Sequence, residues 1–333
     1  MMMRRFAVFL GILVGLSLPA AASAKTYNWK LAHHRSPEAQ VHKDLLEFSE
    51  KVKQGTDGKV NISIMAGGQL GSWTVAQERV AMGNFEMTIA PMATAVDKRM
   101  ECALLPAAVL DWETASKKFV AGSPFLELIS TWALEQNLQI LAPYPFYLGG
   151  IGFTREIETP ENPALNRGFK VRIPEMVSFR LMVQGLGYIP TPIAMTDTFP
   201  ALQTGVVDGI SGGGAEVYYT GGLADVLKAY LPANTHFEVW FMLVNPKKFA
   251  SLPKEYQDVI RKESIALQNK RLKEGPNEEQ KWEKALSDKG VKVYNLTPEQ
   301  LAAYQKIMRD SSWEAIRKVV GAKAFDEAVS LLQ

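Results

Sequence analysis

Segments with the hydrophobic spacing of a strand alternate with segments that have the spacing of a helix along the first part of the chain. Residues 27–31 alternate between apolar and polar, which predicts a strand. Residues 41–52 place apolar side chains three to four positions apart, which predicts a helix ending at Gly55. The succession continues with a strand at 60–64, a helix at 74–82 and a strand at 87–90. This order predicts an α/β fold whose sheet is mostly parallel and carries helices on both faces.

A second series of the same kind starts near Gly150. It comprises strands near Ile151, Val171 and Ile189, a helix at 198–203 and a strand at 206–211. A length of 333 residues agrees with two domains of about 150 residues each. We therefore expect two α/β lobes.

The last hundred residues are charged and helical. Helices are expected at 253–273 and 277–289, separated by Gly275-Pro276, and a further helix should begin at Thr297, where a threonine cap precedes Pro298. A helical tail after two lobes predicts that the tail straps them together, an arrangement suited to a cleft that opens and closes.

The N-terminus has the pattern of a cleaved secretory signal. Arg4 and Arg5 precede an apolar run at 6–18, and Ala22-Ser23-Ala24 resembles a cleavage site. Thirteen apolar residues are too few for a bilayer span, which needs about 20. We predict a signal peptide at 1–24 and an exported mature chain.

Charge and cysteine usage narrow the classes of partner. Loss of two arginines with residues 1–24 leaves 35 basic against 35 acidic residues, which gives no basic field for nucleic acid. The single cysteine, Cys102, excludes an intramolecular disulfide, so the fold must be held by its core. We expect no nucleic-acid partner, no cofactor and no metal, since His33, His34 and His42 lack a convincing zinc spacing.

Arg172 is the strongest candidate for chemistry. It lies at the end of the strand predicted at 170–173, because Pro174 cannot continue a central strand. A guanidinium group there can hold a carboxylate through two parallel hydrogen bonds. The alternative is a structural arginine paired with a glutamate such as Glu175.

Several strings together resemble one known family. Leu31-Ala32-His33 and His42-Lys43 fall where the DctP-like receptors of tripartite ATP-independent periplasmic (TRAP) transporters read LAH and HK, and residues 67–71 resemble NGQLG. Residues 168–174 resemble GLKIRVP, and residues 204–209 match TGVVDG. The order and spacing of these strings, behind a signal peptide, make the resemblance specific.

The resemblance implies a monomeric periplasmic receptor with a two-lobed clamshell fold of mixed sheets. Lobe I would comprise 25–149 with 238–275, and lobe II 150–237 with 276–333. Such a receptor binds a small organic acid, delivers it to the membrane subunits of a TRAP permease and performs no chemistry. In the family, the arginine of the RVP string holds the ligand carboxylate, and this position is Arg172 here.

Two departures from the family pattern bear on the ligand. Ile151 stands where a second arginine is common, and Gly212-Gly213-Gly214 replace a polar loop. With a single fixed cation and free space beside it, we predict a bulky or aromatic monocarboxylate rather than a sugar acid or short dicarboxylate.

Further ligand contacts are expected around this arginine. Glycines before a helix expose backbone N–H groups to an anion, and Met195 takes the place of a cleft aromatic in the family. For each of these residues the alternative is an ordinary core, turn or surface role. The expected set is Trp73, His33, Met195, Phe179, Gly212, Gly213, Glu216 and Trp240.

One enzyme interpretation competes with the receptor. Residues 209–213 fit the G-x-S-x-G pattern of a serine hydrolase, with Ser211 as nucleophile and Asp225 and His236 following in order. Only 25 residues separate Ser211 from His236, which is too few for the elements that usually carry acid and base to one place. Signatures of other enzyme classes are missing, so the receptor is favoured.

Overall fold

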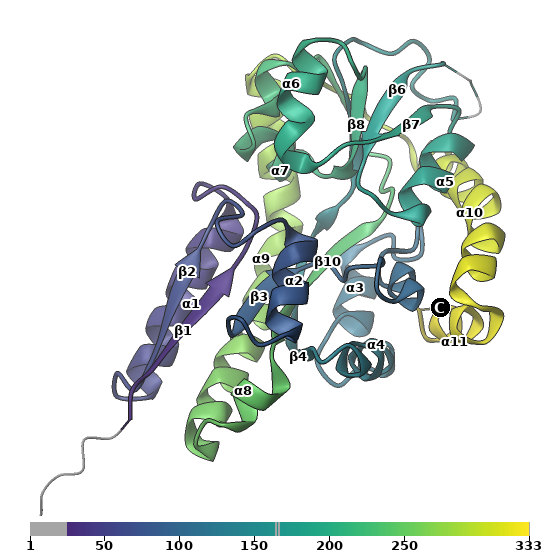
Figure 1. Ribbon diagram of the computed structural model, residues 1–333. Coiled ribbons are helices and arrows are strands. Elements are labelled where there is room, and N and C mark those ends of the chain that lie inside the picture. The colour runs from purple at the N-terminus through teal and green to yellow at the C-terminus, as the bar shows by residue number, and fades with distance from the viewer. Residues whose placement is uncertain (1–24, 164, 166, 333) are drawn as a thin grey trace, which may run out of the picture.

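Figure 1 shows the computed structural model, which describes residues 25–163, 165 and 167–332. The expected signal peptide at 1–24 lies outside the described residues. Two mixed sheets flanked by helices form two lobes, one below and one above in this view. This confirms the predicted fold class.

The first sheet has the order β2-β1-β3-β10-β4 and belongs to the lower lobe of Figure 1. Strands β1 and β2 pair in parallel from Tyr27 with Val60 to Ala32 with Met65, as the alternating apolar residues of both segments predict. The sheet is not mostly parallel, because β10 runs antiparallel to both β3 and β4. Its strands are β1 (Tyr27–Ala32), β2 (Val60–Met65), β3 (Met87–Ala90), β4 (Gln139–Leu148) and β10 (Phe237–Val244).

The second sheet has the order β11-β9-β5-β8-β6-β7 and is also mixed. Strands β6 and β8 pair in parallel, and β5 runs antiparallel to both of its neighbours, β8 and β9. The strand expected at 206–211 begins later, since residue 206 is exposed and pairing starts at Gly209. The strands are β5 (Gly150–Phe153), β6 (Lys170–Ile173), β7 (Ile189–Pro192), β8 (Gly209–Gly213), β9 (Ala229–Leu231) and β11 (Lys292–Val293).

Helices cover both sheets and connect them. In the first half of the chain they are α1 (Gln40–Gly55), α2 (Trp73–Ala81), the 3-10 helix η1 (Lys98–Leu104), α3 (Trp112–Lys118), α4 (Pro124–Glu135) and α5 (Val177–Gly185). In the second half they are η2 (Met195–Asp197), α6 (Thr198–Gln203), α7 (Ala215–Thr220), η3 (Leu223–Asp225), α8 (Pro246–Ala250), α9 (Lys254–Asp288), α10 (Pro298–Val320) and α11 (Ala322–Leu332). The expected start at Thr297 is confirmed by a complete capping box with Gln300.

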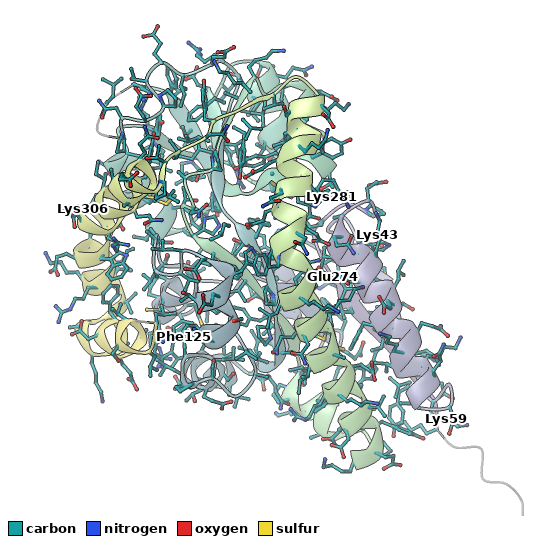
Figure 2. The ribbon with its side chains drawn as sticks, turned by 180° about the vertical axis from the view of Figure 1, so that it is seen from behind. Lys43, Lys59, Phe125, Glu274, Lys281 and Lys306 are labelled. Carbon is teal, nitrogen blue, oxygen red and sulfur yellow. The ribbon has the colours of Figure 1, made fainter. Side chains whose placement is uncertain are left out.

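Helix α9 differs from the prediction of two helices split at Gly275-Pro276. It is one helix of 35 residues with Pro276 inside it. The helix runs up the back of the molecule past both lobes, with Glu274 and Lys281 along its length in Figure 2. It packs against β4 and α1 of the lower lobe and against α7 and β11 of the upper lobe. A proline removes one hydrogen bond, and the packing on either side holds the helix together.

The lobes are also joined where two strands pass between the sheets. Only Gly149 separates β4 from β5, and its N–H and C=O pair with the backbone of His236 and Thr235 beside it. A Cβ atom at Gly149 would lie 2.2 Å from the His236 ring, so only glycine fits this crossing. The C-terminal helix α10 packs on both α5 and η1, so the tail bridges the lobes as expected.

The interior is apolar and continuous across the lobes. One core cluster joins residues such as Met100 and Phe125 of the lower lobe to Phe153, Val171 and Met182 of the upper one. Cys102 is free and buried within it. Among the described helices, none is long and apolar enough to cross a membrane.

Candidate functional site

A cavity of about 670 Å³, which we call the cleft, opens between the lobes and takes its lining from both. A smaller space of about 40 Å³, the inner pocket, shares with it His34, Arg35, Trp73, Arg172, Pro174 and Met195. The remaining lining of the inner pocket is Pro91, Leu104, Met176, Phe179, Gly212 and Glu238.

Arg172 lies near the end of β6 and lines both spaces. Its neighbours Val171 and Ile173 are buried in the core, Pro174 stops the strand, and Arg172 itself is only 4% exposed. Its Nε donates to the carbonyl of Ile193 at 2.7 Å and its Nη1 to that of Ser211 at 3.4 Å.

No carboxylate among the described residues forms an ion pair with Arg172, so the alternative pairing with Glu175 is not formed. Burial lowers the pKa of Arg172 to about 10, and the nearby Arg35 contributes in the same direction. The guanidinium group stays charged at neutral pH and faces the cavity without an acidic partner. A buried cation in this state favours an anionic ligand.

The start of helix α5, beside Arg172, is held from the other lobe. Both carboxylate oxygens of Glu101, on η1, accept backbone N–H groups, from Val177 and from Ser178, at 3.0 Å each. Glu101 thereby replaces the side-chain cap that Met176 cannot supply. The contact links the loop that follows Arg172 to the lower lobe.

Arg35 is the cleft residue that sequence reasoning missed. It follows β1, is 9% exposed and lines both the cleft and the inner pocket. Its Nη2 donates to the Tyr147 hydroxyl at 3.2 Å, and its guanidinium carbon lies 5.1 Å from the ring centroid of Trp240. Only the polar context of His33-His34-Arg35-Ser36 hinted at it, because no periodicity or motif marks this loop.

His34 lies next to Arg35 in both spaces. Its ring lies 4.6 Å from that of Trp240. Burial, followed by the positive charge of Arg35, holds the pKa of His34 well below its usual value, so the ring is neutral at pH 7. Its Nδ1 is buried and has no hydrogen-bond partner among the described residues. His34 therefore offers a neutral polar group to a ligand.

Four further residues of the expected set line the cavities. Trp73, the first residue of α2, and Met195, the first residue of η2, border both spaces. Phe179 and Gly212 border the inner pocket. Gly212 has φ +89°, and a Cβ atom there would lie 2.7 Å from Pro174 Cδ, so glycine is required beside Arg172.

Four other expected residues line neither the cleft nor the inner pocket, which corrects their placement. His33 turns away and its Nε2 lies 3.0 Å from His42 Nδ1. Gly213 lies against the ring of Tyr218, which a Cβ atom would approach to 2.6 Å. Trp240 is fully buried behind Arg35 and His34. Of these residues, Trp240 supports the lining, because Arg35 and His34 pack on its ring.

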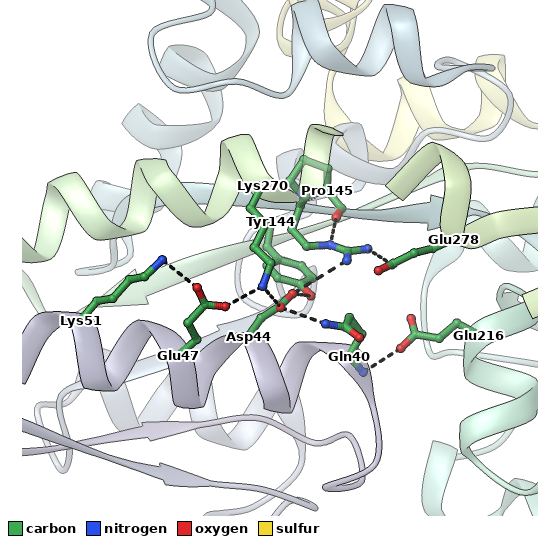
Figure 3. A network of polar contacts seen from close by, with 10 residues as sticks. Gln40, Asp44, Glu47, Lys51, Tyr144, Pro145, Glu216, Lys270 and Glu278 are labelled. Carbon is green, nitrogen blue, oxygen red and sulfur yellow. Dashed lines mark hydrogen bonds and ion pairs between the residues drawn. The ribbon is translucent and has the colours of Figure 1, made fainter. Parts of the chain in front are cut away.

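Glu216, the fourth, belongs to a network between the lobes (Figure 3). Its Oε1 accepts the backbone N–H of Gln40, at the start of α1, at 3.0 Å. The Gln40 side chain donates to Asp44, which also accepts from the Tyr144 hydroxyl and from Lys270 of α9. Burial raises the pKa of Glu216. The carboxylate therefore ties α7 to α1 instead of facing a ligand.

The hydrolase interpretation fails on geometry. Ser211 is fully buried, and its Oγ has no hydrogen-bond partner among the described residues. His236 engages other groups: its Nδ1 lies 2.9 Å from Thr235 Oγ1 and its Nε2 2.9 Å from Glu238 Oε2. A serine nucleophile needs a base within hydrogen-bond reach, and none contacts Ser211.

The expectation of a single fixed cation is also wrong. Ile151 is fully buried in the core and lines neither space, yet a second guanidinium group reaches the cavity as Arg35 from the other lobe. Among the described residues, no group of three or more His, Cys, Asp or Glu could hold a metal ion.

Two lobes around a cavity with a buried arginine, which forms no ion pair with a described residue, have the arrangement of a two-lobed solute-binding protein. The family model "Bacterial extracellular solute-binding protein, family 7" (DctP) matches residues 31–318. The chain therefore belongs to the DctP family, whose members are the non-enzymatic receptors of TRAP transporters.

Individual relatives agree with this assignment. The chain is 25% identical over 311 residues, 90% of its length and 91% of the relative's, to the C4-dicarboxylate-binding periplasmic protein DctP of Rhodobacter capsulatus. A TRAP solute-binding protein of Desulfovibrio salexigens, solved with orotic acid, is 20% identical with a TM-score of 0.82, over 92% of this chain and 100% of that one. DctP7 of Bordetella pertussis, a receptor binding pyroglutamic acid, is 17% identical with a TM-score of 0.82, over 92% and 99%. At these identities the solved structures show the fold alone.

Proposed function

We propose that this receptor binds a small organic acid in the cleft and delivers it to the membrane subunits of a TRAP permease, with Arg172 holding the acid group. The observation that carries this proposal is a guanidinium group, 4% exposed and without an ion-pair partner among the described residues, facing a cavity of about 670 Å³. We further propose that the receptor acts as a periplasmic monomer with lobes 25–149 plus 238–275 and 150–237 plus 276–333.

The residues that line the cavity support a preference for a bulky or aromatic monocarboxylate. The argument no longer depends on a single cation, because two arginines face the inner pocket. In the inner pocket, Arg35 and Arg172 carry two formal positive charges and Glu238 carries one negative charge. The net formal charge of +1 matches one carboxylate. A second ligand carboxylate would meet Glu78 and Glu175 on the cleft wall.

Apolar side chains provide the remaining surface for the body of the ligand. They come from both lobes and border the cleft: Trp73, Ile193, Met195, Phe199, Val217 and Leu223. Each square ångström of apolar ligand surface buried against them contributes about 25 cal/mol, less the cost of ordering the ligand. Orotic acid and pyroglutamic acid, bound by two similar receptors, are monocarboxylates, whereas a receptor of Sulfurospirillum deleyianum was solved with succinate.

Calorimetry with phenylpyruvate, orotate, succinate and galactonate tests the ligand class. We expect phenylpyruvate or orotate to bind more tightly than succinate and galactonate, because only they combine one carboxylate with a flat ring that can pack against the apolar side chains of the cleft. Tighter binding of succinate or galactonate would contradict the monocarboxylate preference and leave the receptor function intact.

Substitution of Arg172 tests how the acid group is held. Arg172→Ala should weaken binding of the tightest of these acids by about 2–5 kcal/mol, because a buried charged pair is lost. Arg172→Lys should restore only part of it, since an ammonium group lacks the planar pair of donors. Arg317→Ala is the control, because Arg317 pairs with Asp326 on the C-terminal helices, away from the cleft. Unchanged affinity in Arg172→Ala would sink the proposal.

A further inference from the structure

Two guanidinium groups from opposite lobes face the same small space. Arg35 follows β1 of the lower lobe and Arg172 ends β6 of the upper lobe, and both line the inner pocket of about 40 Å³. Each is at least nine-tenths buried. Like charges in a space of this size repel each other strongly, because little water remains to screen them.

Both groups are held from behind by neutral partners. Arg35 is anchored by the Tyr147 hydroxyl and the Trp240 ring, and Arg172 by the backbone carbonyls of Ile193 and Ser211. The one carboxylate of the inner pocket, Glu238, is engaged elsewhere, with its Oε1 accepting from Trp240 Nε1 at 2.6 Å and its Oε2 2.9 Å from His236. Neither arginine is neutralised by an ion pair with a described residue.

Buried polar atoms without a partner lie at the same place. Arg35 Nε has no hydrogen-bond partner among the described residues, and neither has Nδ1 of His34. Both side chains line the cleft. Buried polar atoms without partners are uncommon in folded proteins, and these two belong to side chains that border the cavity.

We propose that one anionic group of the ligand lies between Arg35 and Arg172 and bridges the two lobes, which makes Arg35 a second binding residue that couples ligand charge to lobe closure. The inference rests on the proposed function. Without the anion, the two cations push the lobes apart at this point; with it, each cation attracts the same negative charge. The receptor therefore distinguishes an acid from a neutral molecule of the same shape by whether the lobes close.

The first test needs no ligand. The variants are Arg35→Met and Arg172→Met, alone and combined, since methionine keeps an apolar side chain and removes the charge. Each single change already removes the repulsion between the two cations, and the double change can remove it only once. Unfolding by urea should therefore show that the double variant is less stable than the sum of the two single effects predicts. Additive effects, or a double variant more stable than the sum, would overturn the proposal.

The second test uses phenylpyruvate and its neutral methyl ester, with calorimetry for affinity and X-ray scattering for closure. In the wild type, phenylpyruvate should compact the protein and the ester should not. Arg35→Met should weaken phenylpyruvate binding on the order of tenfold or more and abolish compaction at saturation, with Arg35→Lys in between and Arg317→Met as the charge-loss control.

The outcomes separate this inference from the proposed function. If Arg172→Met abolishes binding while Arg35→Met binds and closes like the wild type, Arg35 is no bridge and the receptor function stands. If the wild type binds neither phenylpyruvate nor orotate, succinate or galactonate, the proposed function fails and the bridge fails with it.

Discussion

At the scale of single residues, burial decides what each ionisable group can do. Arg172 is buried without an acid and faces a cavity, whereas Glu216 is buried and satisfied by a backbone N–H across the lobes. His33 is buried beside His42, and burial lowers its pKa to about 4, so it is neutral and structural. Residue type alone does not separate these cases, because exposure and partners set the charge state.

Glu279 leads to a pH prediction at this scale. Burial raises its pKa to about 7, and its Oε1 accepts the N–H of Leu148 at 2.5 Å, next to the strand crossing at Gly149. The carboxylates of Glu216, Glu278 and Glu283 line the same small cavity. A raised carboxyl pKa means that the folded state binds more protons than the unfolded state between about pH 4.5 and 7. The Glu279 contribution to stability therefore falls as pH rises through that window.

Glu279→Gln should remove this contribution, because an amide stays neutral at every pH and its oxygen can still accept from Leu148. The free energy of unfolding of the variant, relative to wild type, should increase between pH 4.5 and 7.5 by on the order of 3 kcal/mol. Urea titrations at several pH values measure it. The exposed Glu255 on the same helix supplies the control, as Glu255→Gln; a difference between Glu279→Gln and wild type that does not change with pH would refute the assignment.

At the scale of elements, α9 shows packing overriding local sequence. Gly275-Pro276 reads as a break, yet the helix continues from Lys254 to Asp288. The reason lies outside the helix: a Cβ atom at Gly275 would lie 2.1 Å from the Trp112 ring, so glycine allows that ring to pack directly on the helix backbone. Trp112 in turn packs edge to face with Phe237 of β10. The glycine thus serves a tertiary contact.

Gly275→Ala therefore tests two opposing effects. Alanine favours a helix over glycine by about 1 kcal/mol, whereas overpacking a core contact costs about 1–3 kcal/mol. We expect net destabilisation, measured by urea unfolding, because an aromatic ring held on both sides cannot move 1 Å freely. In a Trp112→Leu background the same substitution should become stabilising. Stabilisation by Gly275→Ala in the wild-type background would contradict this expectation, because it would mean that the Trp112 ring moves to make room for the methyl group.

At the scale of the whole molecule, the connections favour a hinge. The lobes are joined by the β4 to β5 crossing at Gly149, by the segment leading into β10 and by the helices α9 and α10, while Arg35 and Arg172 lie in the cleft between the lobes. Few covalent crossings permit rotation of one lobe against the other. A buried acid group also binds more strongly once water is excluded.

Small-angle scattering should show a smaller radius of gyration when the wild-type receptor is saturated with its tightest-binding acid. The Arg172→Ala variant, at the same concentration of acid, should keep the ligand-free radius and so serves as the control. Identical radii for the free and saturated wild type would argue against a clamshell.

The sequence by itself determined many of the elements and the family. Strand β6 with Arg172 at its end, the capped start of α10 at Thr297 and the mixed two-lobed fold implied by the family strings are all present. These features depend on local periodicity, on proline and capping chemistry, or on strings that keep their order along the chain. Each is encoded within a few consecutive residues, so a linear pattern is sufficient to predict it.

Tertiary structure alone decided which side chains meet in the cleft. Arg35 lies in a loop without any pattern, and it becomes a cleft residue only because the lower lobe packs it on Trp240 and turns it toward Arg172. Glu216 and His33 were also expected to contact the ligand, but in the structure Glu216 accepts from Gln40 and His33 contacts His42. Arg35 and Arg172 are 137 positions apart in the sequence, and long-range packing of the two lobes brings them together, which no local pattern of hydrophobic and polar residues specifies.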